Sequence, residues 1–223
     1  MYKICLLYIS LIYCVGISAQ PLPDTCFYKP EQWPQIADTL HTSIPEFVHI
    51  DTTYAPAFYI ALSHYPDLYE TEILFKEKRL KTTAATRPAF WSVFKKPDNR
   101  CYYIFINNRK KEGKAVYYPS LPFNARIGLM GHELSHILDY SDLNTWEILG
   151  MGIKYVFSKN YRRDLEYHID MQAIDHGLGC QIYSFSDYIF NQSNASPAYL
   201  KFKGKYYLQP EDILYYIDND SLP

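Results

Sequence analysis

The chain has 223 residues, of which 48% are hydrophobic, and its formal net charge at pH 7 is −2. A chain of this length can bury a sizeable core as one domain. The near-neutral charge, without a basic stripe along any segment, argues against nucleic acid as the main partner.

Residues 1–19 have the pattern of a Sec-type signal peptide. Lys3 is their only charged residue, an apolar run begins at Ile4, and small residues lead up to Ala19. We therefore expect cleavage after Ala19 and export to the periplasm or the medium, with an uncleaved N-terminal anchor as the alternative. For the remaining domain, residues 20–223, we expect no transmembrane span.

Three cysteines follow the expected cleavage site, at Cys26, Cys101 and Cys180. None of them has a spacing typical of zinc ligands. In an exported protein, an odd number of cysteines permits one disulfide and one spare thiol, but the sequence does not choose the pair. Free, buried thiols are an equally good interpretation.

The first half of this domain predicts short helices and strands. We expect a helix around Glu31–Thr42, a strand or the start of a helix at Phe58–Leu62, and a strand at Thr71–Lys78. Phe90–Phe94 and Cys101–Asn107 flank a Pro-Asp-Asn turn and predict a β-hairpin. The sequence therefore indicates an α+β domain with a small, mainly antiparallel sheet.

A long helix is predicted from Ala125 to Tyr140, with Asn124 as its N-cap. No proline interrupts this segment, and its apolar residues form a stripe that would face the core, made of Ile127, Met130, Leu134, Ile137 and Leu138. On the helical wheel, His132 and His136 lie opposite this stripe. Packing against the core therefore does not account for the two histidines.

Residues 132–136 read His-Glu-Leu-Ser-His. On a helix, His132 and His136 are one turn apart on the same face, so both imidazoles can bind one cation. Glu133 lies further round and can reach a water on that cation without binding the cation itself. Two imidazoles suit Zn²⁺, and a carboxylate beside a zinc-bound water makes that water a hydrolytic nucleophile. The alternative is a surface helix whose histidines bind no metal.

Three other helices complete the predicted fold. Ile182–Phe190 and Pro210–Ile217 are expected to be helices near the C-terminus. Thr145–Phe157 is expected to be a helix too short to span a bilayer. The apolar residues of this helix recur at helical spacing and are expected to face the core: Trp146, Leu149, Ile153 and Val156.

A catalytic zinc normally takes three protein ligands and leaves a fourth position to water. A second helix is predicted over residues 162–176, with Gly177 as its C-cap. Glu166 and Asp170 lie one turn apart on this helix. We expect Glu166 to be the third ligand and Asp170 to accept a hydrogen bond from the other ring nitrogen of a ligand histidine.

Other residues are alternatives for the third ligand. Asp170 is the first substitute if Glu166 does not bind the metal. Asp139 follows His136 by three residues and could reach the metal face, but an aspartate in the last turn of a helix is commonly solvated. His168 and His176 are less favoured, because the first points away from the Glu166 face and the second lies at the end of its helix.

The two motifs together, His132-Glu133-x-x-His136 and Glu166-x-x-x-Asp170, resemble those of the gluzincin family of zinc metallopeptidases. The Glu-Tyr-x-x-Asp-x-x-Ala run that begins at Glu166 is similar to that of membrane-associated zinc endopeptidases. The resemblance covers the motif region only. It implies a zincin-like domain in which His132, His136 and Glu166 bind Zn²⁺, Glu133 is the catalytic base and Asp170 supports the site. The multi-span membrane region of those enzymes has no counterpart here, so their substrates do not carry over.

The sequence thus predicts an exported zinc metallopeptidase that hydrolyses a peptide or protein substrate through a zinc-bound water activated by Glu133. Tyr140, Tyr161, Tyr167 and His168 are all conceivable donors to the oxyanion. The strand at Cys101–Asn108 is a candidate for the edge of a substrate cleft, with an ordinary internal strand as an equal alternative.

Two other functions remain open at the level of sequence. One is an exported binding or structural module with a vestigial or structural zinc site. The other is a zinc hydrolase that acts on a non-peptide amide, such as a cell-wall bond.

Overall fold

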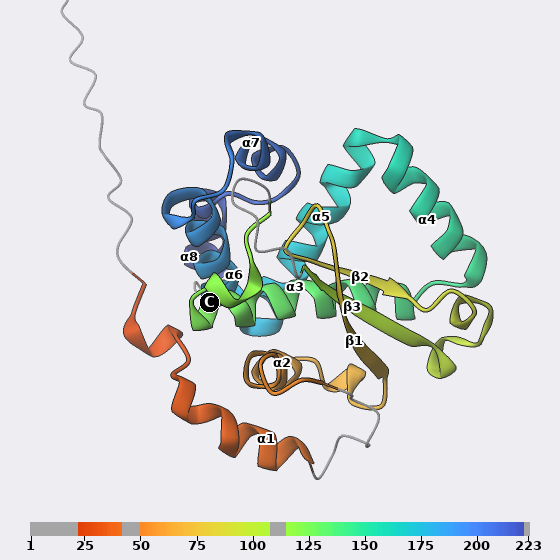
Figure 1. Cartoon of the computed structure of the whole chain (residues 1–223), viewed down its shortest axis with the longest axis horizontal. Coiled ribbons are helices and arrows are strands. Elements are labelled where there is room, and N and C mark those ends of the chain that lie inside the picture. Colours follow the sequence, from red (N-terminus) through yellow and green to blue (C-terminus); the bar gives the residue numbers. More distant parts are fainter. Residues whose placement is uncertain (1–21, 42–49, 108–114, 221–223) are drawn as a thin grey trace, which may run out of the picture.

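The structure is a computed structural model that describes residues 22–41, 50–107 and 115–220. The expected signal peptide, residues 1–19, lies outside the described residues. Helices surround a small sheet in an α+β fold (Figure 1). In chain order they are α1 (Trp33–His41), α2 (Ala55–Leu62), α3 (Phe123–Ser141), α4 (Thr145–Phe157), α5 (Lys159–Ala173), α6 (Gly179–Asp187), α7 (Pro197–Tyr206) and α8 (Pro210–Asp220). Among the helices in these ranges, none combines the length and the apolar character that crossing a membrane requires.

The sheet has three strands in the order β1-β3-β2. They are β1 (Glu72–Lys78), β2 (Ala84–Pro88) and β3 (Cys101–Asn107). β3 pairs in parallel with β1 and antiparallel with β2. The sheet is therefore mixed, whereas the sequence predicted a mainly antiparallel one. The difference arises because β3 inserts between the two earlier strands instead of adding beyond β2.

The predicted hairpin of Phe90–Phe94 with Cys101–Asn107 is wrong in its first strand, because Ala84–Pro88 (β2) pairs with β3 instead. Phe90–Phe94 belongs to the connection between β2 and β3, where Ser92–Phe94 is a turn of 3-10 helix. β2 ends at Pro88, and one further bond, from the Ala89 N–H to the Cys101 carbonyl, joins the two strands beyond it. The interpretation of Cys101–Asn108 as a cleft edge is wrong for β3, because β3 is the central strand and pairs on both sides. β2 is an outer strand and packs against α3.

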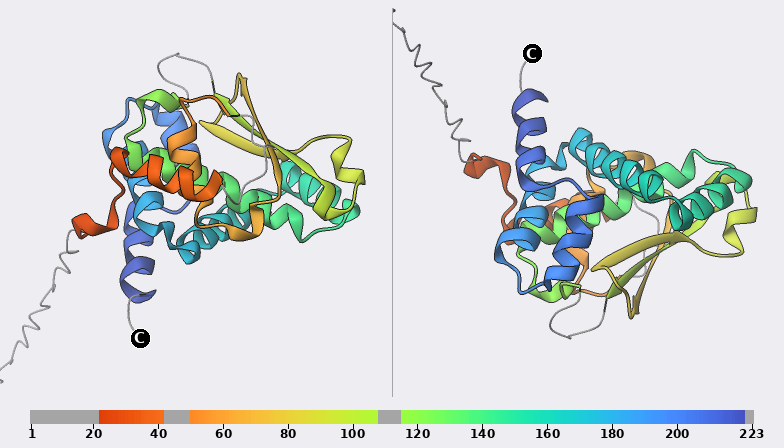
Figure 2. Two further views of the ribbon diagram at one scale, coloured as in Figure 1. Left: turned by 90° about the horizontal axis from the view of Figure 1, so that it is seen from below. Right: turned by 90° about the horizontal axis from the view of Figure 1, so that it is seen from above.

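α3 lies at the centre of the fold, between α2 on one side and α5 and α6 on the other (Figures 1 and 2). The predicted apolar stripe of this helix is buried, as at Ile127, Met130 and Leu134. Because neighbouring elements cover the opposite face as well, His132 and Glu133 are also buried. The histidine motif therefore lies in the interior of the protein.

Gly128 allows α3 and α6 to pack closely. A Cβ atom at this position would overlap the backbone carbonyl of Gln181 in α6. We expect Gly128→Ala to lower the free energy of unfolding by about 1–3 kcal/mol, because two backbones would have to separate. Gly150→Ala is the matched control, since nothing lies within 4 Å of a Cβ there and alanine favours a helix by up to about 1 kcal/mol. Urea unfolding would measure both, and equal stabilities would contradict the close packing.

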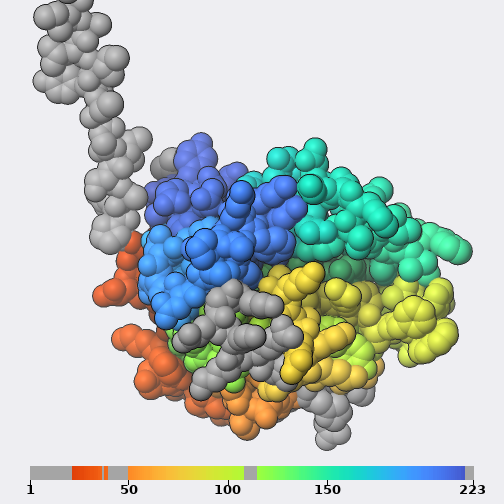
Figure 3. Space-filling view, turned by 45° about the horizontal axis from the view of Figure 1, so that its top comes forward, coloured from red at the N-terminus to blue at the C-terminus, as the bar shows by residue number. Residues whose placement is uncertain are grey.

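α4 does not have the place in the fold that its sequence predicted. Its apolar stripe was expected in the core, but Trp146, Ile153 and Val156 are exposed, and within this fully described helix only Ile148 is buried. α4 packs on α5 and on the 3-10 turn, where the Thr145 hydroxyl donates to the Val93 carbonyl at 2.8 Å. The helix thus lies on the surface, beside the connection between β2 and β3 (Figure 3).

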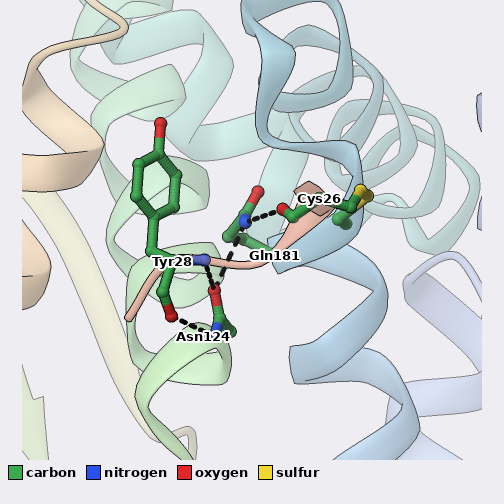
Figure 4. The surroundings of a disulfide bond; sticks show 5 residues. Cys26, Tyr28, Asn124 and Gln181 are labelled. Carbon is green, nitrogen blue, oxygen red and sulfur yellow. Dashed lines mark hydrogen bonds between the residues drawn. A yellow bond between two sulfur atoms is a disulfide. The ribbon is translucent and has the colours of Figure 1, made fainter. Parts of the chain in front are cut away.

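A disulfide joins Cys26, near the start of the described chain, to Cys180 in α6 (Figure 4). Cys101 is a buried free thiol at the start of β3. The structure therefore chooses one bridge and one spare thiol from the alternatives that the sequence left open. A disulfide is compatible with an exported protein.

Asn124 does not cap α3, because Pro122 occupies the N-cap position and no side chain caps the helix. The Asn124 amide instead pairs with the backbone of Tyr28, accepting from its N–H and donating to its carbonyl, both at 2.9 Å. Gln181 donates to the carbonyl of Cys26 at 2.9 Å (Figure 4). These amides and the disulfide together fix the N-terminal segment across α3 and α6.

Candidate metal centre

Two imidazole rings project from one face of α3. His132 and His136 are one turn apart, and their ring centroids are 4.9 Å apart at nearly a right angle. His132 is buried and His136 nearly so. The helix therefore brings the two side chains together as their spacing predicts.

Glu166 of α5 completes the group. Its Oε2 lies 3.3 Å from Nε2 of His132 and 3.7 Å from Nε2 of His136. Possible ligand atoms of the three residues all lie within 4.8 Å of one another. The two helices thus form a buried His/His/Glu group that could hold a metal ion. His136 and Glu166 are 30 residues apart in the sequence.

Asp170 lies behind His132, one turn after Glu166. Its Oδ1 is 2.7 Å from Nδ1 of His132, and its Oδ2 accepts from the backbone N–H of Leu208 at 3.1 Å. The carboxylate therefore holds the imidazole by Nδ1 and turns Nε2 toward Glu166. This is the role that the sequence predicted for Asp170.

Tyr155 of α4 fixes the orientation of Glu166. The Tyr155 hydroxyl donates to Oε1 of Glu166 at 2.5 Å, while Oε2 of the same carboxylate is buried without a hydrogen-bond partner. One oxygen is thus occupied by the protein and the other faces both histidines. The sequence did not predict this contact, because Tyr155 lies on a helix expected to be part of the scaffold.

Oε2 of Glu133 is a buried side-chain oxygen with no hydrogen-bond partner, and Oε2 of Glu166 is buried facing only the two imidazole rings. Unpartnered buried carboxylate oxygens are costly unless a cation or a water satisfies them. Two imidazole nitrogens and one carboxylate oxygen form a donor set that Zn²⁺ prefers at catalytic sites. His132, His136 and Glu166 therefore fit a divalent metal.

The carboxylates control the protonation of the group when it holds no metal. Burial alone would lower the pKa of His132, but Asp170 and then Glu166 outweigh it and raise this pKa to about 10. Burial would raise the pKa of Glu166, but the His132 and His136 rings hold it well below its usual value. At neutral pH the metal-free site is thus an imidazolium between two carboxylates.

We expect metal binding to displace the proton of His132. Since the pKa of this residue is about 10, binding at pH 7.5 should release about one proton, and the apparent affinity should rise as pH rises toward that pKa. Calorimetry in two buffers of different ionisation enthalpy measures the release. Identical binding enthalpies in both buffers would show that His132 is neutral before the metal binds.

Two residues near α7 also belong to the site, although the sequence did not predict them. The ring centroid of Tyr207 is 5.7 Å from that of His132. The ammonium of Lys203 lies 3.2 Å from the centre of the Tyr207 ring. Burial lowers the pKa of Lys203 to about 8, against the attraction of Asp170, Glu166 and Glu133. A buried cation therefore lies behind the carboxylates of the site.

The weaker ligand candidates are not part of the His/His/Glu group. Asp139 is instead 3.1 Å from His168, whose ring is largely exposed. His176 lies 2.7 Å from the Gln172 carbonyl through Nδ1. Within the described ranges, His132, His136 and Glu166 form the only group of three histidine, cysteine or acidic residues close enough to share a metal.

The candidates for the oxyanion donor are also narrowed. Tyr140 stacks on His136, with ring centroids 6.3 Å apart, and the charges of Glu166 and Glu133 add to burial in raising its pKa. Burial and the charges of the same two carboxylates also raise the pKa of Tyr207. Tyr161 packs instead under Lys154. Tyr140 and Tyr207 therefore lie near the site as possible oxyanion donors, whereas the hydroxyl of Tyr155 already donates to Glu166.

Comparisons of the chain with known protein families, with curated proteins and with solved structures found no match. The site is therefore interpreted from its own geometry and from the two sequence motifs.

Proposed function

We propose that this protein is a zinc-dependent metallopeptidase of the gluzincin type. The observation that carries the proposal is the convergence of His132, His136 and Glu166, together with the buried, unpartnered carboxylate oxygen of Glu133, the residue that follows His132 on α3. A structural zinc site is normally closed by four protein ligands, whereas a catalytic site keeps one position open. No fourth histidine, cysteine or acidic residue joins the group within the described residues, which favours catalysis over a structural role.

His132, His136 and Glu166 would hold Zn²⁺, which when bound would supply an activated water and polarise a substrate carbonyl. Glu133 would act as the general base that accepts a proton from the attacking water and passes it to the leaving nitrogen. Asp170 keeps Nδ1 of His132 occupied, so that Nε2 is the donor atom. Tyr155 holds Glu166 by its other oxygen. Tyr140 or Tyr207 donates a hydrogen bond to the oxyanion.

The outer edge of β2 is the proposed site for the peptide backbone. Asn107 donates to Thr83, and Ala89 donates to Cys101, so alternate residues of β2 face β3. Thr86, which lies between them, therefore directs its N–H and C=O away from β3. An extended peptide can pair with such an edge. Its position next to α3 supports substrate binding there.

Metal analysis and an activity assay on the same preparation test the proposal. Protein that begins at Gln20 retains every described residue. We expect about one zinc per chain, cleavage of an unfolded protein substrate, loss of cleavage with a chelator, and recovery when zinc is added. Zinc binding without cleavage of peptides would favour the binding or structural module. Cleavage that survives chelation would exclude the metal mechanism.

A further inference from the structure

Large apolar side chains are exposed at one end of the molecule in two groups. In the connection between β2 and β3, Trp91 is 79% exposed, with Phe90 and Phe94 beside it. On α4, Trp146 is 79% and Phe157 84% exposed. The remaining members of the second group are Leu149, Ile153 and Val156. We call these two groups together the aromatic end.

The two groups form one surface. α4 packs on the 3-10 turn Ser92–Phe94, and the hydrogen bond from Thr145 to Val93 joins them. Figure 3 shows residues 90–100, in yellow, beside α4, in teal. In both views of Figure 2 they form a tapered end of the molecule, away from α8. The surface is thus a projection, which suits insertion into a soft medium better than the capture of a ligand.

The apolar face of α4 has little packing against the rest of the described chain. Gly150 and Gly152 lie in the middle of the helix, where each costs up to about 1 kcal/mol relative to alanine. Nothing lies within 4 Å of a Cβ atom built on either glycine. A helix of 13 residues is marginal in water without packing. The apolar stripe of α4 is therefore left uncovered by the described part of the chain.

Basic side chains border the aromatic end. Lys95 and Lys96 follow Phe94 directly and are exposed. Lys154 is exposed on α4, and Lys159 is exposed at the start of α5. These cations belong to a chain whose overall charge is −2. These four lysines can contact anionic groups of a partner, while the exposed acids Asp98 and Glu147 lie among them.

We propose that the aromatic end binds the surface of a lipid bilayer that carries anionic headgroups. Tryptophan and phenylalanine prefer the depth between headgroups and acyl chains, and lysines beside them interact with anionic lipids. α4 would lie in the plane of the interface, since 13 residues are too few to cross it. A second copy of the chain fits less well, because two projecting ends would bring their lysines face to face. This inference does not depend on the metallopeptidase activity.

Sedimentation with vesicles tests the inference, using protein from Gln20 onward so that the apolar leader is absent. We expect wild-type protein to bind vesicles that contain phosphatidylglycerol. Trp91→Ser combined with Phe94→Ser should reduce the partition coefficient about tenfold or more, because two inserted aromatic rings are lost. Lys95→Glu combined with Lys96→Glu should remove the preference for phosphatidylglycerol over pure phosphatidylcholine.

Tyr215→Ser is the matched control, since Tyr215 is an exposed aromatic residue on α8, at the other end of the molecule. It should bind vesicles as the wild type does, and all variants should keep the wild-type melting temperature. Equal vesicle binding by the Trp91/Phe94 variant and the wild type would overturn the inference. A wild type that ignores vesicles but forms dimers, which the same double variant abolishes, would assign the surface to a second copy instead.

Discussion

Replacing Glu133 by alanine is expected to abolish cleavage of an unfolded protein substrate while zinc remains bound at one ion per chain. A general base contributes about 10²–10⁴-fold to the rate of such a reaction, so turnover should fall by at least this factor. Zinc should be retained because Glu133 is not part of the His/His/Glu group. The fold should survive as well, because Oε2 of Glu133 has no hydrogen-bond partner that the substitution would strand. Single-turnover kinetics and metal analysis of the purified variant measure both effects.

Glu133→Gln separates the loss of the base from the loss of the side chain. Glutamine keeps nearly the same shape but cannot accept a proton, so its activity should be as low as that of alanine. Glu70→Ala removes an exposed glutamate and should leave activity unchanged. Wild-type cleavage rates in either Glu133 variant would remove this residue as the base and leave the proposed mechanism without one.

The elements that the sequence predicted correctly are those with strong local signals. α3 has an unbroken apolar stripe, and its burial follows from that stripe. β3 alternates, so that Tyr102 and Ile104 are buried while Tyr103 between them is not fully buried. Gly177, predicted as the C-cap of the second ligand helix, lies in the π-helical turn Ile174–Leu178 that follows α5, with a φ of +80°, a conformation that favours glycine.

The features that the sequence did not predict depend on which elements meet. Local alternation is the same whether β3 lies beside β2 or between β1 and β2, so strand order could not be predicted. The apolar residues of α4 recur at helical spacing whether or not the protein covers them, so their exposure could not be predicted. α7 was not predicted because Tyr-Leu-Lys-Phe-Lys alternates like a strand, although Ser196 followed by Pro197 is typical of a helix start.

The same division holds within the candidate site. His132 and His136, like Glu166 and Asp170, are pairs one helical turn apart, and helix geometry alone gives each pair a common face. Tyr155 and Tyr207 reach the site from other elements, whose approach is fixed by tertiary packing. Lys203 also reaches the site through tertiary packing, and no pattern in the sequence distinguishes it from the solvated lysines of α7.

Glu166→Ala is expected to weaken zinc binding far more than Asp139→Ala. Loss of Glu166 removes a ligand, and the affinity should fall by more than the roughly 10–100-fold that loss of a residue supporting a ligand costs. Asp139 pairs only with the largely exposed His168, so removing it should leave the affinity nearly unchanged. Competition with a chromophoric chelator measures both constants. Equal affinities in the two variants would show that Glu166 is not a ligand.

Asp170→Asn tests the alternative assignment, in which Asp170 and not Glu166 is the third ligand. Asparagine can still accept from Leu208, but it loses the charge that holds His132, so a loss of about 10–100-fold in zinc affinity is expected. The predicted order of effect is therefore Glu166, then Asp170, then Asp139. If Asp170 were itself the third ligand, its loss would exceed that of Glu166, and the order of the first two would reverse. The ranking thus separates the two carboxylates of α5, which lie one turn apart: Glu166 faces Nε2 of both histidines, whereas Asp170 faces Nδ1 of His132.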